Sequence, residues 1–231
     1  MTSNTDQLIP SIDVLYEDDN VLVINKPAGI SMHRINESDQ SVTIRDIYDS
    51  RLADNDPIRG GIVHRLDKDT SGVVVLAKNN PSLEFLQKQF ADRTVEKIYL
   101  ALVWGHLKHP RARIELPLSR SNKSPTAMQV SPNGKMSVSE YHVTAEYGPY
   151  SYLSVSLHTG RTHQIRVQFA HIGHPVVGDK MYGHKDLPEG LSRQFLHASS
   201  ITLTLPGTVK KRTFNAPLAA DLRAFLESID G

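Results

Sequence analysis

The chain has 231 residues, of which 39% are hydrophobic, so it is long enough to bury the core of one large domain or two small ones. Its 26 Lys and Arg against 25 Asp and Glu give a formal charge of +1, which excludes a basic tail protein and an acidic disordered chain. The absence of cysteine excludes disulfides, thiol catalysis, cysteine-ligated zinc and iron–sulfur clusters. Carboxylates, hydroxyls, imidazoles and amines remain as the reactive groups.

The N-terminus carries neither the basic start nor the apolar stretch of a signal peptide, and no window approaches about 18 consecutive apolar residues. We therefore expect a soluble cytoplasmic protein with no membrane partner. No repeat, low-complexity tract or linker divides the chain. This predicts an N-terminal tail over residues 1–13 and one domain over residues 14–231.

The near-neutral total hides a charge asymmetry. Residues 1–56 hold 4 Lys and Arg against 11 Asp and Glu, whereas the remaining chain holds 22 against 14. Within the basic part, residues 106–123 contain five Lys and Arg, with Glu115 as the one acidic residue. The stretch from Lys108 to Lys123 is therefore either a loop that faces a polyanion or an ordinary solvated surface.

The first part of the chain predicts an opening hairpin, two helices and two further strands. An Asp- and Asn-rich turn at residues 17–20 separates the strands of the hairpin. Apolar residues recur at helical spacing over residues 44–52, and Asn80 is suited to cap a second helix that has Pro81 at its first position and ends near residue 92. The predicted strands are Val14–Tyr16, Val21–Asn25, Val73–Ala77 and Ile98–Trp104.

The rest of the chain predicts two strand pairs and two helices. Gly160 opens a helix that Gly173 stops, and apolar residues over 218–226 predict an amphipathic closing helix. The strand pairs are residues 141–145 with 153–157, and residues 201–205 with Lys211–Phe214. Because these strands lack regular βαβ alternation, we expect an α+β fold on a largely antiparallel sheet.

The densest polar segment, residues 61–72, lies directly before a predicted buried strand. It offers the carboxylate of Asp67, with Arg65 two residues earlier and a Thr70-Ser71-Gly72 turn after it. A loop held by a rigid sheet is a common place for catalytic residues. The same residues are also ordinary turn formers, so a capped turn without chemistry is an equally simple interpretation of the pattern.

A second polar segment, residues 159–168, brings Arg161, His163 and Arg166 to the start of a predicted helix. Positive side chains at a helix N-terminus oppose the helix dipole, so stability alone does not select them. The pattern favours an anionic partner, with a solvated helix face as the alternative.

Other chemistries fit the sequence poorly. His163, His171 and His174 could suggest a metal, but the spacing is not that of a zinc helix and no cysteine is available, so no metal is expected. Ser71 lacks the Gly-x-Ser-x-Gly context of a hydrolase nucleophile. Glycine-rich phosphate loops are absent as well.

Several segments together resemble one enzyme family. His64-Arg65-Leu66-Asp67 followed by Thr70-Ser71-Gly72 resembles the catalytic motif of the RluA-type RNA pseudouridine synthases. Five further segments resemble family motifs in the same order, and the resemblance covers about Val14 to Pro217. The further segments start at Asn25-Lys26-Pro27, Lys97-Ile98-Tyr99, Gly160-Arg161-Thr162, Gly173-His174-Pro175 and Leu196-His197-Ala198.

The resemblance implies the pseudouridine synthase catalytic fold, a largely antiparallel mixed sheet with flanking helices and a central RNA-binding cleft. It implies an enzyme that detaches uracil from its ribose, turns the base and rejoins it through carbon 5, without a cofactor. Asp67 matches the family's catalytic aspartate, and Arg166 matches the arginine that pairs with it. Such a pairing is physically reasonable, because a fixed guanidinium keeps a partly desolvated carboxylate ionised. Tyr99 matches the tyrosine that stacks on the uracil, with its hydroxyl available for a late proton transfer, so the resemblance implies three catalytic residues, Asp67, Tyr99 and Arg166.

The resemblance also implies an RNA partner, either ribosomal or transfer RNA, whose target base must leave its stack. Arg65 is expected to fill the vacated space, and Arg161 and His163 to contact phosphates or neighbouring bases. We expect no obligate protein partner and a monomer. A non-catalytic RNA-binding or ribosome-assembly factor with the same fold is the alternative.

Two departures from the family pattern accompany the match. The chain has about thirteen residues before the first predicted strand, so it resembles members that consist of the catalytic domain alone. Gln168 stands where the third motif commonly has a histidine, which leaves a role for that position in doubt.

Overall fold

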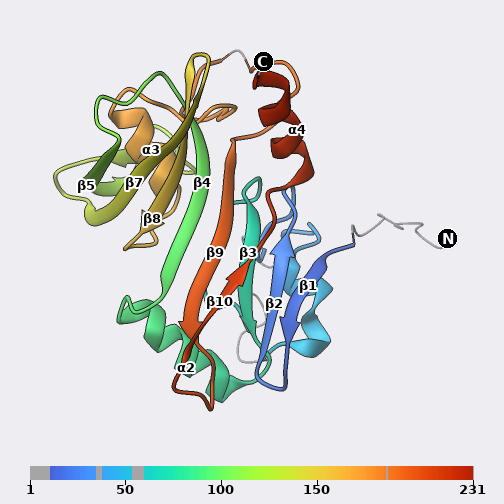
Figure 1. Cartoon of the computed structure of the whole chain (residues 1–231). Coiled ribbons are helices and arrows are strands. Elements are labelled where there is room, and N and C mark those ends of the chain that lie inside the picture. The colour runs from blue at the N-terminus through green and yellow to red at the C-terminus, as the bar shows by residue number, and fades with distance from the viewer. Residues whose placement is uncertain (1–10, 35–37, 54–59, 186, 231) are drawn as a thin grey trace.

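A computed structural model describes residues 11–34, 38–53, 60–185 and 187–230, so most of the expected N-terminal tail lies outside the described residues. The described residues form one ten-stranded sheet with four α-helices and one 3-10 helix (Figure 1). None of these helices has the length and apolar character needed to cross a membrane.

Most of the elements are strands. The strands are β1 (Asp13–Glu17), β2 (Val21–Lys26), β3 (Ser71–Ala77), β4 (Glu96–Trp104), β5 (Arg111–Arg120), β6 (Met128–Val130), β7 (Lys135–Tyr147), β8 (Tyr150–Leu157), β9 (Leu196–Thr204) and β10 (Lys211–Asn215). The helices are α1 (Ile44–Ile47), the 3-10 helix η1 (Asp49–Arg51), α2 (Asn80–Ala91), α3 (Gln164–His171) and α4 (Ala220–Ile229).

The sheet runs in the order β1-β2-β3-β9-β4-β8-β7-β5-β6, and β10 pairs with β9. Within the described strands, β3 and β9 form the one parallel pair, and every other pairing is antiparallel. This confirms the predicted α+β class with a largely antiparallel mixed sheet. The three predicted hairpins are present as β1–β2, β7–β8 and β9–β10.

Two predicted helix starts are shifted, and a third predicted helix is divided. Asn79 rather than Asn80 caps α2, because its side chain accepts a hydrogen bond from the backbone N–H of Ser82 at 3.0 Å. The helix expected from Gly160 begins at Gln164, after a turn that ends with His163 at a φ of 53°. The helical pattern over residues 44–52 is divided between α1 and η1.

The expectation of a loop between Lys108 and Lys123 is wrong, because most of this stretch is strand β5. Its alternating pattern buries Ile114 and Leu118 and exposes the basic residues. Arg113 pairs on the exposed face with Glu115 and with Glu140 of β7. Proline and charge suggested a loop, but pairing with β7 over eight residues overrides them.

The middle of the sheet carries the core. β3, β9 and β4 lie side by side between a lobe with β5, β7, β8 and α3 and a lobe with β1 and β2 (Figure 1). The sheet is covered on both faces, because Tyr99 and Ala101 of β4 belong to the main core cluster whereas Leu102 packs with residues of α4. Side chains of these central strands are therefore held in fixed positions.

Gly72 allows the close approach of β3 and β9 at their parallel pairing. Its φ is 121°, and a Cβ added there would lie 2.2 Å from the carbonyl oxygen of Ala198. Both the backbone conformation and the space therefore require glycine. This contact fixes the end of the loop that carries Asp67.

Gly72→Ala is expected to destabilise the protein by at least about 3 kcal/mol, because β3 and β9 must separate to admit the methyl group. Gly207→Ala is the matched control, since Gly207 has a φ of 77° but no atom within 4 Å of an added Cβ. The control should cost only about 1–2 kcal/mol. Equal losses in urea unfolding for the two variants would refute the close-approach argument.

Candidate active site

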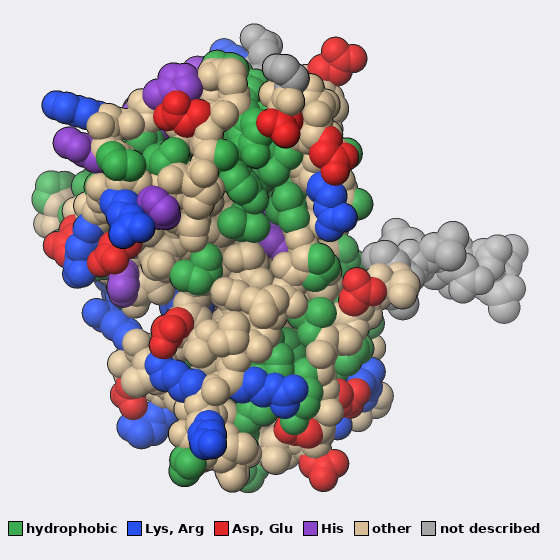
Figure 2. Space-filling view, in the orientation of Figure 1, with side chains coloured by type: hydrophobic (Ala, Val, Ile, Leu, Met, Phe, Trp, Pro, Cys, Tyr) green, Lys and Arg blue, Asp and Glu red, His purple; other side chains and the backbone are tan. Residues whose placement is uncertain are grey.

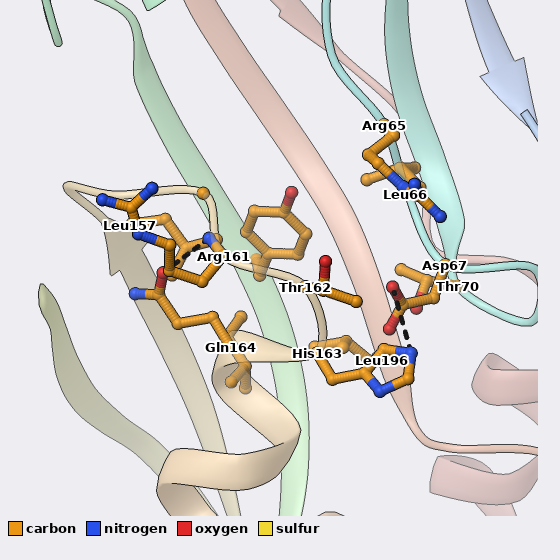
Figure 3. A pocket seen from close by; sticks show the side chains of 13 residues that line it. Arg65, Leu66, Asp67, Thr70, Leu157, Arg161, Thr162, His163, Gln164 and Leu196 are labelled. Carbon is orange, nitrogen blue, oxygen red and sulfur yellow. Dashed lines mark hydrogen bonds and ion pairs between the residues drawn. The ribbon is translucent and has the colours of Figure 1, made fainter. Parts of the chain in front are cut away.

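Three segments far apart in sequence meet in one pocket at the centre of the sheet. The loop before β3 contributes Arg65, Asp67 and Thr70, and β4 contributes Tyr99. The turn before α3 and the first two residues of that helix contribute residues 160–165. In Figure 3 the side chains of Asp67 and His163 lie next to each other, joined by a dashed line, and Arg161 and Gln164 lie on the other side of the pocket. Two of the three predicted catalytic residues, Asp67 and Tyr99, thus line the same space.

The third predicted catalytic residue, Arg166, lies behind this wall in an ion-pair network. Its Nη1 is 3.1 Å from Oδ2 of Asp67, which confirms the contact expected from the resemblance. Its Nε and Nη2 donate to both carboxylate oxygens of Asp179, at 2.6 and 2.9 Å. One guanidinium therefore holds a buried carboxylate and the pocket carboxylate at once.

Burial and charge are balanced in this network. Burial alone would lower the pKa of Arg166, but the hydrogen bonds and charge of Asp179, together with the smaller influence of Asp67, raise it above its usual value. Burial alone would raise the pKa of Asp179, but the same hydrogen bonds and charge of Arg166 lower it. Arg166 and Asp179 therefore stay charged at neutral pH although both are buried.

Asp179 is itself fixed by the chain that follows it. Its Oδ1 accepts hydrogen bonds from the backbone N–H groups of Met181 and Tyr182 at 2.9 and 3.1 Å. The ring of Tyr182 lies under the Arg166 guanidinium, with 5.2 Å between the guanidinium carbon and the ring centroid. Because Asp179 is fully buried, this arrangement gives Arg166 one orientation.

His163 lies inside the pocket rather than on an outer face. Its Nε2 is 3.8 Å from Oδ1 of Asp67, and its Nδ1 shares a hydrogen bond of 2.8 Å with the hydroxyl of Tyr182. Burial lowers the pKa of His163, while the charge of Asp67 opposes that change. A mostly neutral imidazole beside Asp67 is better suited to orient groups in the pocket than to attract phosphates.

Tyr99 forms the floor of the pocket from the central strand β4. It is 8% exposed, and it is paired with Val155 of β8 on one side and Ala198 of β9 on the other. Burial, and to a lesser extent the charge of Asp67, raise the pKa of the Tyr99 hydroxyl well above its usual value. The hydroxyl therefore stays protonated and can donate a hydrogen bond within the pocket.

The side chain of Lys26 holds one side of the loop that carries Asp67. The fully buried Lys26 donates to the carbonyl oxygens of Pro27, Ile30 and Lys68, at 2.8, 2.8 and 3.0 Å. Burial lowers the pKa of Lys26, and the three carbonyls compensate its ammonium by accepting all three N–H groups. The backbone N–H of Gly29 also donates to Lys68, so β2 and its following turn hold the loop.

Arg193 holds the same loop from the other side. Its Nη1 donates to the carbonyl oxygen of Asp69 at 3.0 Å and its Nη2 to the hydroxyl of Ser71 at 3.1 Å. A two-point ion pair with Asp221 of α4, at 2.6 and 2.9 Å, orients the guanidinium. Ser71 in turn contacts Nδ1 of His197 at 2.9 Å, so α4 and β9 both support the segment after Asp67.

The residues predicted to bind RNA are partly brought together. Arg65 is exposed at the pocket, and Arg161 and His163 line it. None of the basic residues between Lys108 and Lys123 lines this pocket.

Gln168, at the position of the departure from the family pattern, is fully buried and contacts Ser137 and Ser139 of β7. Its position is structural, because it joins α3 to the sheet.

Sequence reasoning gave no role to four residues that hold the pocket. These residues are Lys26, Asp179, Tyr182 and Arg193, and each acts through a contact with a distant segment. Asp179 had one available signal: a buried arginine on a helix requires a carboxylate partner. The sequence contains 25 acidic residues and does not say which of them is near Arg166.

Asp179→Asn is expected to destabilise the protein by about 3 kcal/mol or more at pH 7, since it leaves Arg166 buried with a single partner. The folded-state pKa of Asp179 is lowered, so the stabilisation is present above the unfolded value of about 4 and is lost as pH falls through the folded value. The stability difference from wild type should therefore shrink below pH 4. Asp69→Asn, an exposed change on the nearby loop, is the control, and a pH-independent difference for Asp179→Asn would contradict the assignment.

Comparisons with known proteins identify the family. Residues 20–171 match the model of the RNA pseudouridylate synthase family. The chain is 39% identical over 242 residues to an uncharacterized RNA pseudouridine synthase of Chlorobaculum parvum, which covers 94% of this chain and 74% of the relative. It is 37% identical over 234 residues to ribosomal large subunit pseudouridine synthase D of Nitrosomonas europaea, covering 98% of this chain and 67% of the relative.

Solved structures agree with these matches. Human RNA pseudouridylate synthase domain containing 1 superposes with a TM-score of 0.70 at 25% identity, over 95% of this chain and 94% of that chain. Human RNA pseudouridylate synthase domain containing 4 superposes with a TM-score of 0.74 at 23% identity and shares the fold. From the family match and these relatives, the chain belongs to the RNA pseudouridylate synthase family, whose members isomerise uridine in RNA.

Proposed function

We propose that this chain isomerises uridine in large-subunit ribosomal RNA, with Asp67 as the catalytic carboxylate. The observation that carries the assignment of Asp67 is its position: an 18%-exposed carboxylate that opens into the pocket while Arg166 contacts it from behind. The names of the relatives from Nitrosomonas europaea and Vibrio vulnificus, both ribosomal large subunit pseudouridine synthases, support the choice of RNA.

Asp67 acts in its ionised form in this proposal. Uracil leaves the ribose, turns and rejoins through carbon 5, and an ionised carboxylate either attacks the sugar or base or removes a sugar proton. Arg166 opposes the cost of keeping the Asp67 charge in a partly desolvated pocket, and Asp179 prevents Arg166 from turning away. Arg166 is therefore a positioning and charge-balancing residue, while Asp67 contacts the substrate.

Tyr99 and His163 shape the space for the base. The backbone of Tyr99 is held between β8 and β9, and its side chain lines the pocket, which suits a ring that packs against the turning uracil. Its protonated hydroxyl is available to donate a proton or a hydrogen bond late in the reaction. His163, held by the Tyr182 hydroxyl at 2.8 Å, lies beside Asp67 and orients its carboxylate.

Reaching Asp67 requires the target nucleotide to leave its stack. Arg65 is exposed, stands two residues before Asp67 and lines the pocket, so it is placed to fill the space that the flipped base leaves. Arg161 also lines the pocket and supplies charge for the RNA backbone. We assign both residues to RNA binding.

The state and location of the enzyme are part of the proposal. We propose that residues 14–231 form the catalytic unit, that it acts as a monomer and that it works in the cytoplasm, where ribosomal RNA is processed in bacteria such as those of its relatives. A molecular mass near 25.7 kDa in light scattering is expected, and about twice that mass would refute the monomer.

Asp67→Asn is expected to fold and bind RNA but to lower the rate of pseudouridine formation by about a thousandfold or more, because the amide carries no charge. The measurement maps pseudouridines in total RNA from cells that lack the gene and carry either the wild-type or the variant copy. Asp69→Asn is the matched control, an exposed carboxylate on the same loop that does not line the pocket. Turnover by Asp67→Asn would remove its catalytic role, and a modified position in transfer RNA would overturn the choice of RNA.

Tyr99→Phe is expected to keep RNA affinity within about threefold and to lower turnover by about 10²- to 10⁴-fold, the range for lost proton transfer. Tyr141→Phe serves as control, because Tyr141 is also buried in β7 but lies outside the pocket. Single-turnover rates at saturating RNA separate the two effects. Unchanged turnover by Tyr99→Phe would restrict this residue to packing.

A further inference from the structure

A second hollow adjoins the catalytic pocket. The two share Arg65, Tyr99 and Arg161, so one continuous surface leads from Asp67 into it. Its other wall is formed by the end of α2 and the start of β4, opposite the end of β8. In Figure 2 the outline of the molecule is notched at the left in this region, with Lys and Arg side chains beside the notch.

The charge of this hollow has one sign. Its lining includes Arg65, Arg93, Lys97 and Arg161, and it includes no Asp or Glu. His64 is not a further cation, because burial lowers its pKa to about 3 and its Nε2 accepts a hydrogen bond from the backbone of Val75. Like charges gathered without a carboxylate leave an uncompensated positive potential that an anion would neutralise.

Lys97 carries the strongest part of this argument. Its side chain is half-buried, and among the described residues it forms no ion pair with a carboxylate. Its Nζ instead lies 5.9 Å from the ring centroid of Phe90. Burial and the charge of Arg93 lower the pKa of Lys97, so the two cations are close enough to repel each other. This repulsion opposes folding, so stability alone does not select the pair of Arg93 and Lys97.

Arg93 is an unfavourable choice for its backbone position. It follows Asp92, which ends α2, and it adopts a φ of 58° in the left-handed region. Glycine is the usual residue where a helix ends in this conformation, because an L side chain is strained there. An arginine in this position, next to a half-buried lysine, indicates a use for its side chain.

We propose that this second hollow binds a backbone phosphate of the nucleotide next to the target uridine, through Arg93 and Lys97. The proposal rests on the function assigned above, because it places the RNA strand on both hollows at once. Arg65 and Arg161, which belong to both, contact the segment between them. The ligand is therefore the RNA strand that continues from the flipped nucleotide.

Two variants remove the charges with little damage to the fold. Arg93→Gly suits the left-handed backbone, and Lys97→Met keeps an unbranched apolar stem in β4. Arg223→Ala is the control, an exposed arginine on α4 that lines neither hollow. Arg93→Gly should unfold at a temperature no lower than wild type while it weakens RNA binding, a combination that a structural role would not produce.

The first measurement compares binding and catalysis. With a transcript of large-subunit ribosomal RNA, we expect Arg93→Gly and Lys97→Met each to raise KM by about three- to tenfold, with kcat unchanged for Arg93→Gly. The slope of log K against log salt should fall by about 0.7–0.9 for each phosphate that the variant no longer neutralises. The Arg223→Ala control should match wild type in both.

The second measurement identifies the phosphate. Hairpin RNAs with one loop uridine carry a neutral methylphosphonate at a single linkage on either side of that uridine. At one of the two linkages, the methylphosphonate should weaken RNA binding by the wild-type protein. The same methylphosphonate should have no further effect on RNA binding by the double variant of Arg93→Gly and Lys97→Met.

Wild-type affinity and salt slope in the double variant would overturn the proposal, as would a methylphosphonate effect equal in wild type and variant. Loss of binding to inorganic phosphate alone, with RNA binding intact, would also overturn it. These failures differ from failure of the assigned function, in which wild type itself forms no pseudouridine in ribosomal RNA.

Discussion

The site depends on the two ion pairs of the buried Arg166. Arg166 contacts Asp67 of one segment and Asp179 of another, so a single guanidinium joins the loop before β3 to the chain after α3. Two carboxylates surround one guanidinium, and Asp67 is the more exposed of the two acids. The fold thus brings one carboxylate to the pocket while the other, the buried Asp179, is compensated by Arg166.

The rest of the structure holds Asp67 at that arginine by bonding to its loop rather than to its side chain. Lys26 and Arg193 reach the loop from opposite sides and bind the carbonyl oxygens of Lys68 and Asp69. Neither contact involves the carboxylate of Asp67, so the loop is fixed without using the side chain that lines the pocket. Burying a cation in a protein interior is costly unless polar groups compensate its charge. Here backbone carbonyls compensate Lys26, and Asp221 of α4 compensates Arg193, so two buried cations can lie around one short loop.

Local patterns predicted the regular elements well where burial alternates clearly. The apolar run Val73–Ala77 became the fully buried strand β3, and the alternation over residues 153–157 became part of β8. The prediction failed for β5, where exposed basic residues and Pro117 suggest a loop but β7 supplies a hydrogen-bonding partner. Helix starts were shifted because the caps depend on side-chain geometry, as for Asn79, and not on residue type alone.

The sequence by itself determined the reactive groups, the family motifs and the α+β class, because residue type, order and periodicity are local properties of the chain. It also led to Asp67, Tyr99 and Arg166 through motifs that occur in order. Only the tertiary structure decided which of 25 acids partners Arg166, that His163 lies beside Asp67, and that Arg93 and Lys97 line a hollow next to the pocket. These are contacts between segments distant in sequence, and charge pairing in a protein interior depends on distance in space.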